Sequence, residues 1–347
     1  MKTFTLLSIV AGFALCTSVS AQLPRIVVDG ITAPQVFTDL NAAIIAAPAN
    51  SNITLSGGSF HVPGGFALDK PLHFVGAGMH TDSTNATGAT ILTASGNDLF
   101  ALTSGASGSS FTGIWFNNAY TTTISLGTGG GDQVVTGVDF LRCMFQNNVR
   151  LGIVEPSNSS SSFTECIFHR VFAGYGGTSV VNRCIFDYAP GTGGMIVTFR
   201  PSGLSLLNSI ILGGMTDFCE NATISNCVFT RLGDGPIWQS EGTTVTNCII
   251  SSHAVFNNTA DTMAIGNFLN VAPTTIFVNE LDGFYQFTDD VHLAGGDVSG
   301  IGLYGMSPPY KPGAVPHVPH IRRVDIARGT DANGNLPATV RVAAQPN

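Results

Sequence analysis

A short unit that recurs through the middle of the chain constrains its fold more than any other feature. Each copy places a cysteine or a similar small residue before an aliphatic residue and an aromatic or second aliphatic residue. The copies centre on Cys143, Cys166, Cys184, Ser209, Cys227, Cys248 and, in a faded form, Asn267. Successive copies lie 23, 18, 25, 18, 21 and 19 residues apart. A period of about 20 residues with variable insertions is typical of a solenoid. Because it is too short for two helices, the sequence predicts an all-β parallel β-helix with one rung per copy.

The residue types of the unit predict which side chains face inward. The cysteine and the residue two positions later lie on the same face of a strand, so stacked rungs form inward columns of like residues. Asparagine precedes this position at Asn208, Asn226 and Asn247, and Asn267 continues the series; asparagine at a bend can bond neighbouring amides. Ser209 replaces cysteine in one rung, which fits a small inward position better than a disulfide partner. We therefore expect a ladder of reduced cysteines, with disulfides between neighbouring rungs as the alternative.

The first residues predict export. Residues 1–21 combine Lys2, an apolar stretch from Phe4 to Leu15 and small residues ending at Ala21, the pattern of a secretory signal peptide. No later segment is long and apolar enough to cross a bilayer, so we expect a secreted or cell-surface protein.

The charge of the chain excludes one class of partner. Only 10% of the residues are charged and the net charge is −8, which gives no electrostatic basis for nucleic-acid binding. The hydrophobic content of 44% also argues against disorder.

The segments outside the repeat predict how the solenoid begins and ends. We expect one β-helix over residues 22–320, capped by a short helix near residues 37–47, where Phe37, Leu40, Ile44 and Ala47 share a face. Residues 321–347 are expected to form a two-strand tail around an Asn333-Gly334 turn, which would cover the far end of the solenoid.

Four stretches resemble a known group of proteins. The stretches 40–44 with 53–60, 69–78, 289–293 and 302–305 look like the entry and last rungs of bacterial secreted right-handed parallel β-helix proteins of the pectate-lyase-like superfold. The resemblance covers roughly residues 36–320 and implies a right-handed β-helix. The chain lacks the aspartate constellation of pectin hydrolases and the calcium-binding aspartates of pectate lyases. The resemblance therefore implies a fold without an activity.

One polar column could carry chemistry. In register, His169, Arg170, Asp187 and Tyr188 follow the unit on adjacent rungs, about 4.8 Å apart. A lyase acting on an acidic sugar needs a base, a cation and an acid, which these side chains could supply. The alternative is a solvated row of polar residues after a strand. Weaker candidates are Asp289, Asp290 and His292 in the last rung, and His317 with His320, which lack a third zinc ligand. No cofactor or metal site is evident.

Three functions remain open from the sequence. The first is a non-catalytic protein that binds glycans or another surface partner through a sheet face. The second is a polysaccharide lyase or glycoside hydrolase that acts on an acidic polysaccharide through the column at 169, 170, 187 and 188. The third is a structural protein whose copies associate with one another. The sequence leaves the oligomeric state undefined.

Overall fold

A computed structural model describes residues 24–343 with short gaps. The undescribed residues are 1–23, 31, 64–65, 81–87, 95–99, 119–121, 129–133, 154, 188–193, 202, 280–283, 288–297, 306–309, 311–319, 327–328, 331–332 and 344–347. The predicted signal peptide therefore lies outside the described residues, as do Tyr188, Asp289, Asp290, His292 and His317. Among the described helices, none is both long and apolar enough to cross a membrane.

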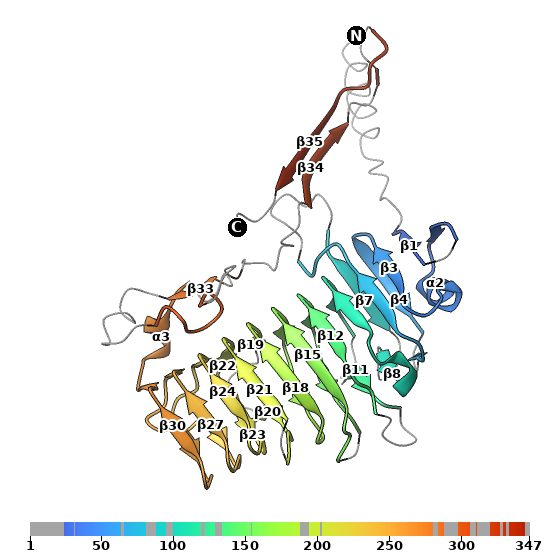
Figure 1. Ribbon diagram of the computed structural model, residues 1–347. Coiled ribbons are helices and arrows are strands. Elements are labelled where there is room, and N and C mark those ends of the chain that lie inside the picture. The colour runs from blue at the N-terminus through green and yellow to red at the C-terminus, as the bar shows by residue number, and fades with distance from the viewer. Residues whose placement is uncertain are drawn as a thin grey trace, which may run out of the picture.

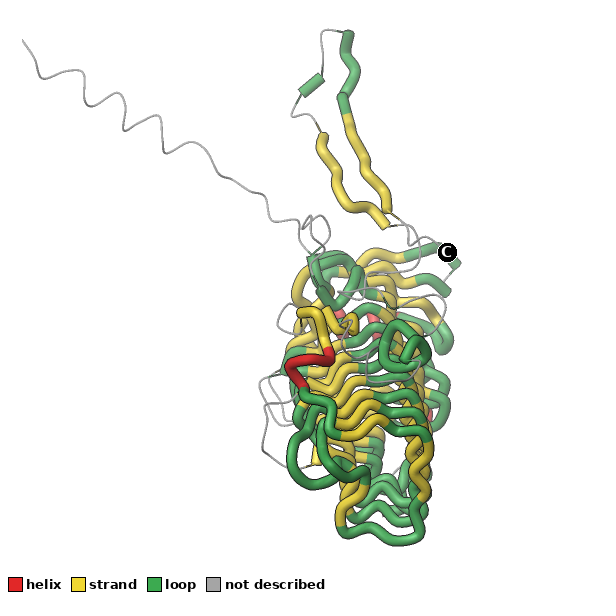
Figure 2. The backbone as a smooth tube through the Cα atoms, turned by 90° about the vertical axis from the view of Figure 1, so that its left-hand side faces the viewer, coloured by secondary structure: helices red, strands yellow, loops and turns green. Residues whose placement is uncertain are grey.

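The chain forms a parallel β-helix, as the repeat predicted. Each rung contributes one strand to each of three long sheets, here called sheets A, B and C, and the rungs stack along one axis (Figure 1). Figure 2 views the stack from the end where β30 lies, with the rungs one behind another. Pairing is parallel throughout the stack except at β1, which runs antiparallel to β2 and β3.

The strand bounds follow the rung order. Sheet A contains β2 (Gln35–Phe37), β1 (Ile26–Val28), β3 (Ser51–Leu55), β6 (Leu72–Val75), β9 (Ser110–Thr112), β12 (Val138–Leu141), β15 (Ser160–Thr164), β18 (Thr178–Asn182), β21 (Leu204–Leu207), β24 (Thr223–Ser225), β27 (Thr244–Thr246) and β30 (Met263–Ile265). Sheet B contains β4 (Gly58–Val62), β7 (Thr90–Ala94), β10 (Trp115–Phe116), β13 (Met144–Phe145), β16 (Ile167–Phe168), β19 (Ile185–Asp187), β22 (Ile210–Leu212), β25 (Val228–Phe229), β28 (Ile249–Ile250) and β31 (Phe268–Leu269). Sheet C contains β5 (Ala67–Leu68), β8 (Phe100–Leu102), β11 (Thr122–Leu126), β14 (Asn148–Arg150), β17 (Phe172–Ala173), β20 (Gly194–Val197), β23 (Met215–Asp217), β26 (Ile237–Trp238) and β29 (Phe256–Asn257).

A short helix lies at the first end of the stack, inside the predicted range of 37–47. Helix α2 spans Leu40–Ala46 and buries Leu40, Ala43 and Ile44 against the core. The helix begins after Asp39, whose carboxylate accepts a hydrogen bond from the amide of Ala42 at 2.7 Å. Phe37 therefore ends strand β2 and lies outside the helix.

Stacked phenylalanines fill the core. On sheet A, Phe74, Phe111, Phe140 and Phe163 stack with ring centroids 5.0, 5.1 and 4.7 Å apart. Sheet B carries a second stack of Phe116, Phe145, Phe168 and Phe186, at 5.2, 5.1 and 4.6 Å. These spacings are close to the distance between hydrogen-bonded strands, so like side chains meet on every rung.

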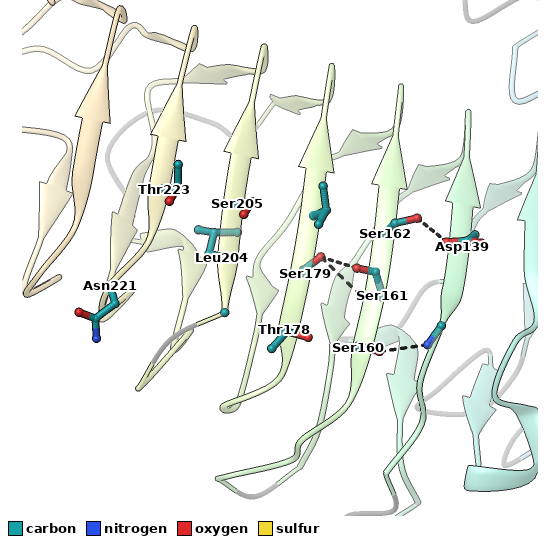
Figure 3. Close-up of a pocket in the computed structure, with 13 residues that line it drawn as sticks. Asp139, Ser160, Ser161, Ser162, Thr178, Ser179, Leu204, Ser205, Asn221 and Thr223 are labelled. Atoms are coloured by element: carbon teal, nitrogen blue, oxygen red, sulfur yellow. Dashed lines mark hydrogen bonds between the residues drawn. The ribbon is translucent and has the colours of Figure 1, made fainter. Parts of the chain in front are cut away.

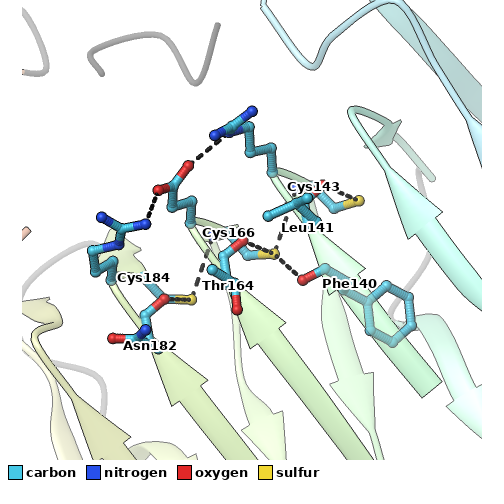
Figure 4. A network of polar contacts seen from close by, with 10 residues as sticks. Phe140, Leu141, Cys143, Thr164, Cys166, Asn182 and Cys184 are labelled. Atoms are coloured by element: carbon cyan, nitrogen blue, oxygen red, sulfur yellow. Dashed lines mark hydrogen bonds and ion pairs between the residues drawn. The ribbon is translucent and has the colours of Figure 1, made fainter. Parts of the chain in front are cut away.

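The cysteines of the repeated unit point inward, as predicted, and they line the corner between sheets A and B. They and Cys219, which follows a strand of sheet C, are buried and carry free thiols. The corner side chain also does more than fill space. Ser209 Oγ accepts the amide of Cys184 on the preceding rung at 3.0 Å and donates to the carbonyl of Leu207 at 2.7 Å. Cys184 Sγ is likewise 3.4 Å from the amide of Cys166 (Figure 4).

Burial also affects the chemistry of these thiols. It raises the pKa of the Cys143, Cys184 and Cys227 thiols well above its ordinary value, because a thiolate would lose its hydration there. These side chains therefore act as small apolar residues of the core.

The residue before each corner cysteine adopts the left-handed conformation. Its φ is 48° at Asn208, 55° at Asn226 and 51° at Asn247, and asparagine tolerates this region better than most residues. Asn267 is the exception to the predicted asparagine series. The pairing of Ile249 with Phe268 places Asn267 in the cysteine column, where its Oδ1 accepts the amide of Cys248 at 2.8 Å.

A segment near the C-terminus covers the outer face of sheet B. The residue after each corner position points outward, yet Met144, Ile167, Ile185, Ile210, Val228 and Ile249 are all buried. They form a second apolar cluster with Met79 and with Ile276, Phe277, Val298, Ile301, Leu303 and Tyr310. This covering segment includes helix α3 (Pro273–Ile276) and the start of the β32–β33 pair (Phe277–Asn279 and Phe284–Phe287).

The predicted C-terminal strands are present, but they do not cover the end of the stack. Strands β34 (His320–Ile326) and β35 (Ala338–Ala343) pair in antiparallel fashion and stand clear of the rungs in both views (Figures 1 and 2). The last rung keeps Met263 at 53% and Ile265 at 55% exposure. The prediction that the tail caps this end is therefore wrong, because β34 and β35 pair with each other and lie away from the last rung.

The corner hydrogen bond makes a testable contribution to stability. Replacing Ser209 with alanine leaves the buried amide of Cys184 without its acceptor, so we expect the free energy of unfolding to fall by about 1–3 kcal/mol. Ser209→Cys should lower the free energy of unfolding less, because a cysteine Sγ contacts the amide of the preceding rung at the same position elsewhere in the column. Ser205→Ala, on the outer face of sheet A in the same rung, is the control and should change stability by less than about 0.5 kcal/mol. Urea unfolding measures all three; equal losses for Ser209→Ala and Ser205→Ala would contradict the assignment.

Candidate functional site

The register brings two of the predicted site residues together. Phe168 pairs with Phe186, so His169 and Asp187 follow on adjacent rungs of sheet B. The Nδ1 atom of His169 lies 3.7 Å from Oδ2 of Asp187, and their side chains are 28% and 50% exposed. At this distance the two form an ion pair when the imidazole is protonated, without a direct hydrogen bond. The arrangement places a base and an acid side by side at the surface.

Of the two other predicted site residues, Arg170 and Tyr188, only Arg170 lies within the described residues. Arg170 follows His169 and is exposed, while the position of Tyr188 lies outside the described residues. His80, which was not predicted as a site residue, comes from the segment after β6 and interacts electrostatically with His169. The pKa of His80 is lowered because partial burial disfavours the charged ring and His169 repels it. The catalytic roles of His169, Arg170, Asp187 and Tyr188 stay a prediction.

A groove on the outer face of sheet A offers a second candidate. Its volume is about 460 Å³, and it crosses the strands β12, β15, β18, β21 and β24 (Figure 3). It is lined by Gly137, Asp139, Ser160, Ser161, Ser162, Thr178, Ser179, Val180, Gly203, Leu204, Ser205, Asn221 and Thr223. The outward hydroxyls are those of Ser160, Ser162, Thr178, Ser205 and Thr223, because parallel pairing repeats the same outward positions on successive rungs. Ser161 and Ser179 are buried and bond each other beneath this surface.

The outward column of this groove is set by strand register. Asp139 pairs with Ser162, Ser162 with Val180, Val180 with Ser205 and Ser205 with Thr223. Ser162 donates to Asp139 Oδ1 at 2.5 Å, and Asn221 donates to the carbonyl of Pro201 at 2.6 Å. Val180 is 48% exposed and gives the middle of the column an apolar patch. The groove therefore combines hydroxyls, a carboxylate and a small apolar surface.

The groove and the covered face of sheet B differ in access. Figure 1 shows sheet A toward the viewer with no described element in front of it, whereas the covering segment occupies the outer face of sheet B. Sequence reasoning missed the groove, because its serines and threonines resemble those of ordinary loops. The available signal was the run Ser159 to Ser162, which aligns with Asp139 once the rungs are in register.

A buried ion network occupies the corner beside the cysteine ladder. On three successive rungs the residue before the cysteine is Arg142, Glu165 or Arg183 in place of asparagine. Arg142 Nε donates to Glu165 Oε2 at 2.6 Å, and Arg183 Nη2 pairs with Glu165 Oε1 (Figure 4). Glu165 is 1% exposed, so its carboxylate has lost its hydration. The ion pairs with the two guanidinium groups offset that loss. The alternation of charge at this column was visible in the sequence, and it indicates a structural contact.

Within the described ranges, no group of three or more His, Cys, Asp or Glu side chains is arranged to hold a metal ion. Of the weak zinc candidates, His320 begins β34, and the position of His317 is not described.

Comparisons with known proteins identify no family for this chain. No family model matches the chain, and no curated protein matches it. Among solved structures, the chain is similar to "Geobacillus virus E2 - ORF18", with 14% sequence identity and a TM-score of 0.47. The match covers 66% of this chain and 57% of that chain, so this chain spans less than two thirds of the other's length. The likeness carries no argument about function.

The ion network has a measurable effect on stability. Glu165→Gln removes the charge that balances two buried guanidinium groups, so we expect the free energy of unfolding to fall by about 3–5 kcal/mol. Glu155→Gln is the matched control, because the Glu155–Arg200 pair is 31% and 39% exposed and should contribute less than about 1 kcal/mol. Urea unfolding of both variants tests this; a loss for Glu165→Gln no larger than that for Glu155→Gln would show that the buried network is not stabilising.

Proposed function

We propose that this protein is an exported, non-catalytic β-helix that binds glycans in the groove on the outer face of sheet A. The observation that carries the proposal is an open groove lined by hydroxyl groups from successive rungs. Sugars present hydroxyls at regular intervals, and a row of fixed donors and acceptors can bond several of them at once. Asp139 and Asn221 add stronger acceptor and donor groups at the two ends of the row.

Export is part of the same proposal. The pattern of residues 1–21 supports removal of a signal peptide, and the first described strand, β1, begins at Ile26. A glycan-binding protein placed outside the cell would meet polysaccharides directly. Fractionation of the expressing cells, with N-terminal sequencing of the released protein, tests this step.

A binding experiment tests the groove. Ser205→Arg places a long charged side chain in the middle of the outward column, so we expect at least a roughly tenfold loss of affinity for the glycan that binds the unaltered protein. Thr244→Arg is the control, because Thr244 lies on the same column beyond the groove. A glycan array identifies the ligand and calorimetry measures the affinity. The proposal would be overturned if no glycan on the array bound the protein, or if Ser205→Arg bound the glycan as tightly as the unaltered protein.

Cleavage of an acidic polysaccharide is the second candidate, and the His169–Asp187 contact favours it. If this pair carries acid–base catalysis, His169→Ala should lower the rate of uronate release at least about a hundredfold. His253→Ala, an exposed histidine on another rung, is the control and should leave the rate unchanged. The absorbance of unsaturated uronates measures lyase action, and reducing-end release measures hydrolysis. Activity that survives His169→Ala and Asp187→Asn would exclude this pair as the catalytic site.

A further inference from the structure

A cluster on the outer face of sheet C is separate from the groove and from the His169 column. Its members are Glu155, Arg200, Asp217, Phe218 and Trp238, and we call it the Trp238 cluster. Thr216 and Ile237 are fully buried, so the next residue on each strand, Asp217 or Trp238, points outward. The cluster therefore lies on the surface of the solenoid.

Trp238 lies between two polar residues on neighbouring rungs. Strand register pairs it with Asp217 on one side and Asn257 on the other. Its side chain is half-buried, which leaves part of the ring open to solvent. An indole face packs against the C–H groups of a pyranose ring, and polar groups about 4.8 Å to either side are placed to bond the hydroxyls at its edge.

Arg200 is held in place beside the aromatic rings. Its Nε donates to Glu155 Oε2 at 3.1 Å, and its guanidinium carbon lies 5.2 Å from the centroid of Phe218. The rings of Phe218 and Trp238 have centroids 6.4 Å apart. Because Arg200 is fixed on two sides, its remaining N–H groups are oriented before any ligand arrives, which lowers the entropic cost of binding.

Asp217 supplies an acceptor that lacks a donor. Its Oδ1 atom is buried and has no hydrogen-bond partner within the described part of the chain. A buried acceptor without a partner is costly, so the carboxylate is not fully satisfied by the protein. The residue as a whole is half-buried, so part of its carboxylate is open to solvent and can accept a hydroxyl from a ligand. Burial raises the pKa of Asp217, against the opposing effects of the Phe218 amide and the Arg200 charge.

We propose that the Trp238 cluster binds an uncharged pyranose, which stacks on Trp238 and donates a hydroxyl to Asp217. Glu155 already balances the charge of Arg200, so Asp217 remains as a carboxylate that disfavours the acid group of a uronic acid. The site goes beyond the sheet A groove, since it lies on a different sheet and shares no residue with it.

Fluorescence provides a direct test, because the chain contains 2 tryptophans, Trp115 and Trp238. Trp115 belongs to sheet B, so Trp115→Phe leaves Trp238 as the single indole reporter. The Trp115→Phe protein is titrated with neutral oligosaccharides of glucose, mannose, galactose and xylose, and with oligogalacturonate. We expect a saturable change in emission with at least one neutral sugar and roughly tenfold weaker binding of oligogalacturonate. No change with any neutral sugar, or a preference for oligogalacturonate, would overturn the proposal.

Two substitutions and two controls in the Trp115→Phe background separate binding from folding. Asp217→Asn and Arg200→Gln should each weaken binding of the neutral sugar at least about fivefold, with unchanged thermal unfolding. Arg150→Gln, on the same outer face, should bind like its parent. Ser205→Arg should also leave the Trp238 titration unchanged, so failure of the groove proposal and failure of this one give different results. Unchanged binding by Asp217→Asn and Arg200→Gln would contradict the site.

Discussion

The corner hydrogen bond between rungs is the interaction on which the rest of the structure depends. A left-handed residue turns the chain from sheet A to sheet B and leaves the next amide without a strand partner. A small side chain on the following rung accepts that amide, as Ser209 does for Cys184. Because the contact recurs at the same position, it fixes the vertical register of neighbouring rungs. Sheet C uses the same device, where Ser240 Oγ accepts the amide of Cys219 at 3.0 Å.

The outer faces of the three sheets differ in their side chains and in whether a later segment covers them. Those differences determine which faces a ligand could reach. Sheet B turns aliphatic side chains outward and is covered by a later part of the chain, with Asn208 donating to the carbonyl of Gly300 at 2.9 Å. Sheet A turns serine and threonine outward and remains open along the groove. Sheet C carries mixed polar and aromatic residues, including Trp238. A single repeated backbone therefore presents one face that a later segment covers and two faces that carry polar side chains.

Much of the fold could be predicted because rung periodicity is local. Cys166 and Cys184 are 18 residues apart, so aligning them also aligned His169 with Asp187, and their 3.7 Å contact follows from that register. The candidate sites were less accessible. His80, whose pKa the charge of His169 lowers, comes from a segment that belongs to no copy of the unit. Insertions of different length precede the strands of sheet C, so no register for Asp217 and Trp238 could be read from the repeat.

The β-helix and its inward columns of like residues could be predicted from the sequence alone, because both depend on alternation within a strand and on a repeated spacing. The choice between free thiols and disulfides came from the structure, in which the six described cysteines are free. Which outward faces are covered became clear from the folded chain alone. Whether an outward Ile185 meets solvent or the cluster around Ile301 depends on how a much later segment folds back, and no local pattern encodes that path. The groove on sheet A and the Trp238 cluster depend on the same path of the covering segment, because both lie on outer surfaces that this segment does not cover.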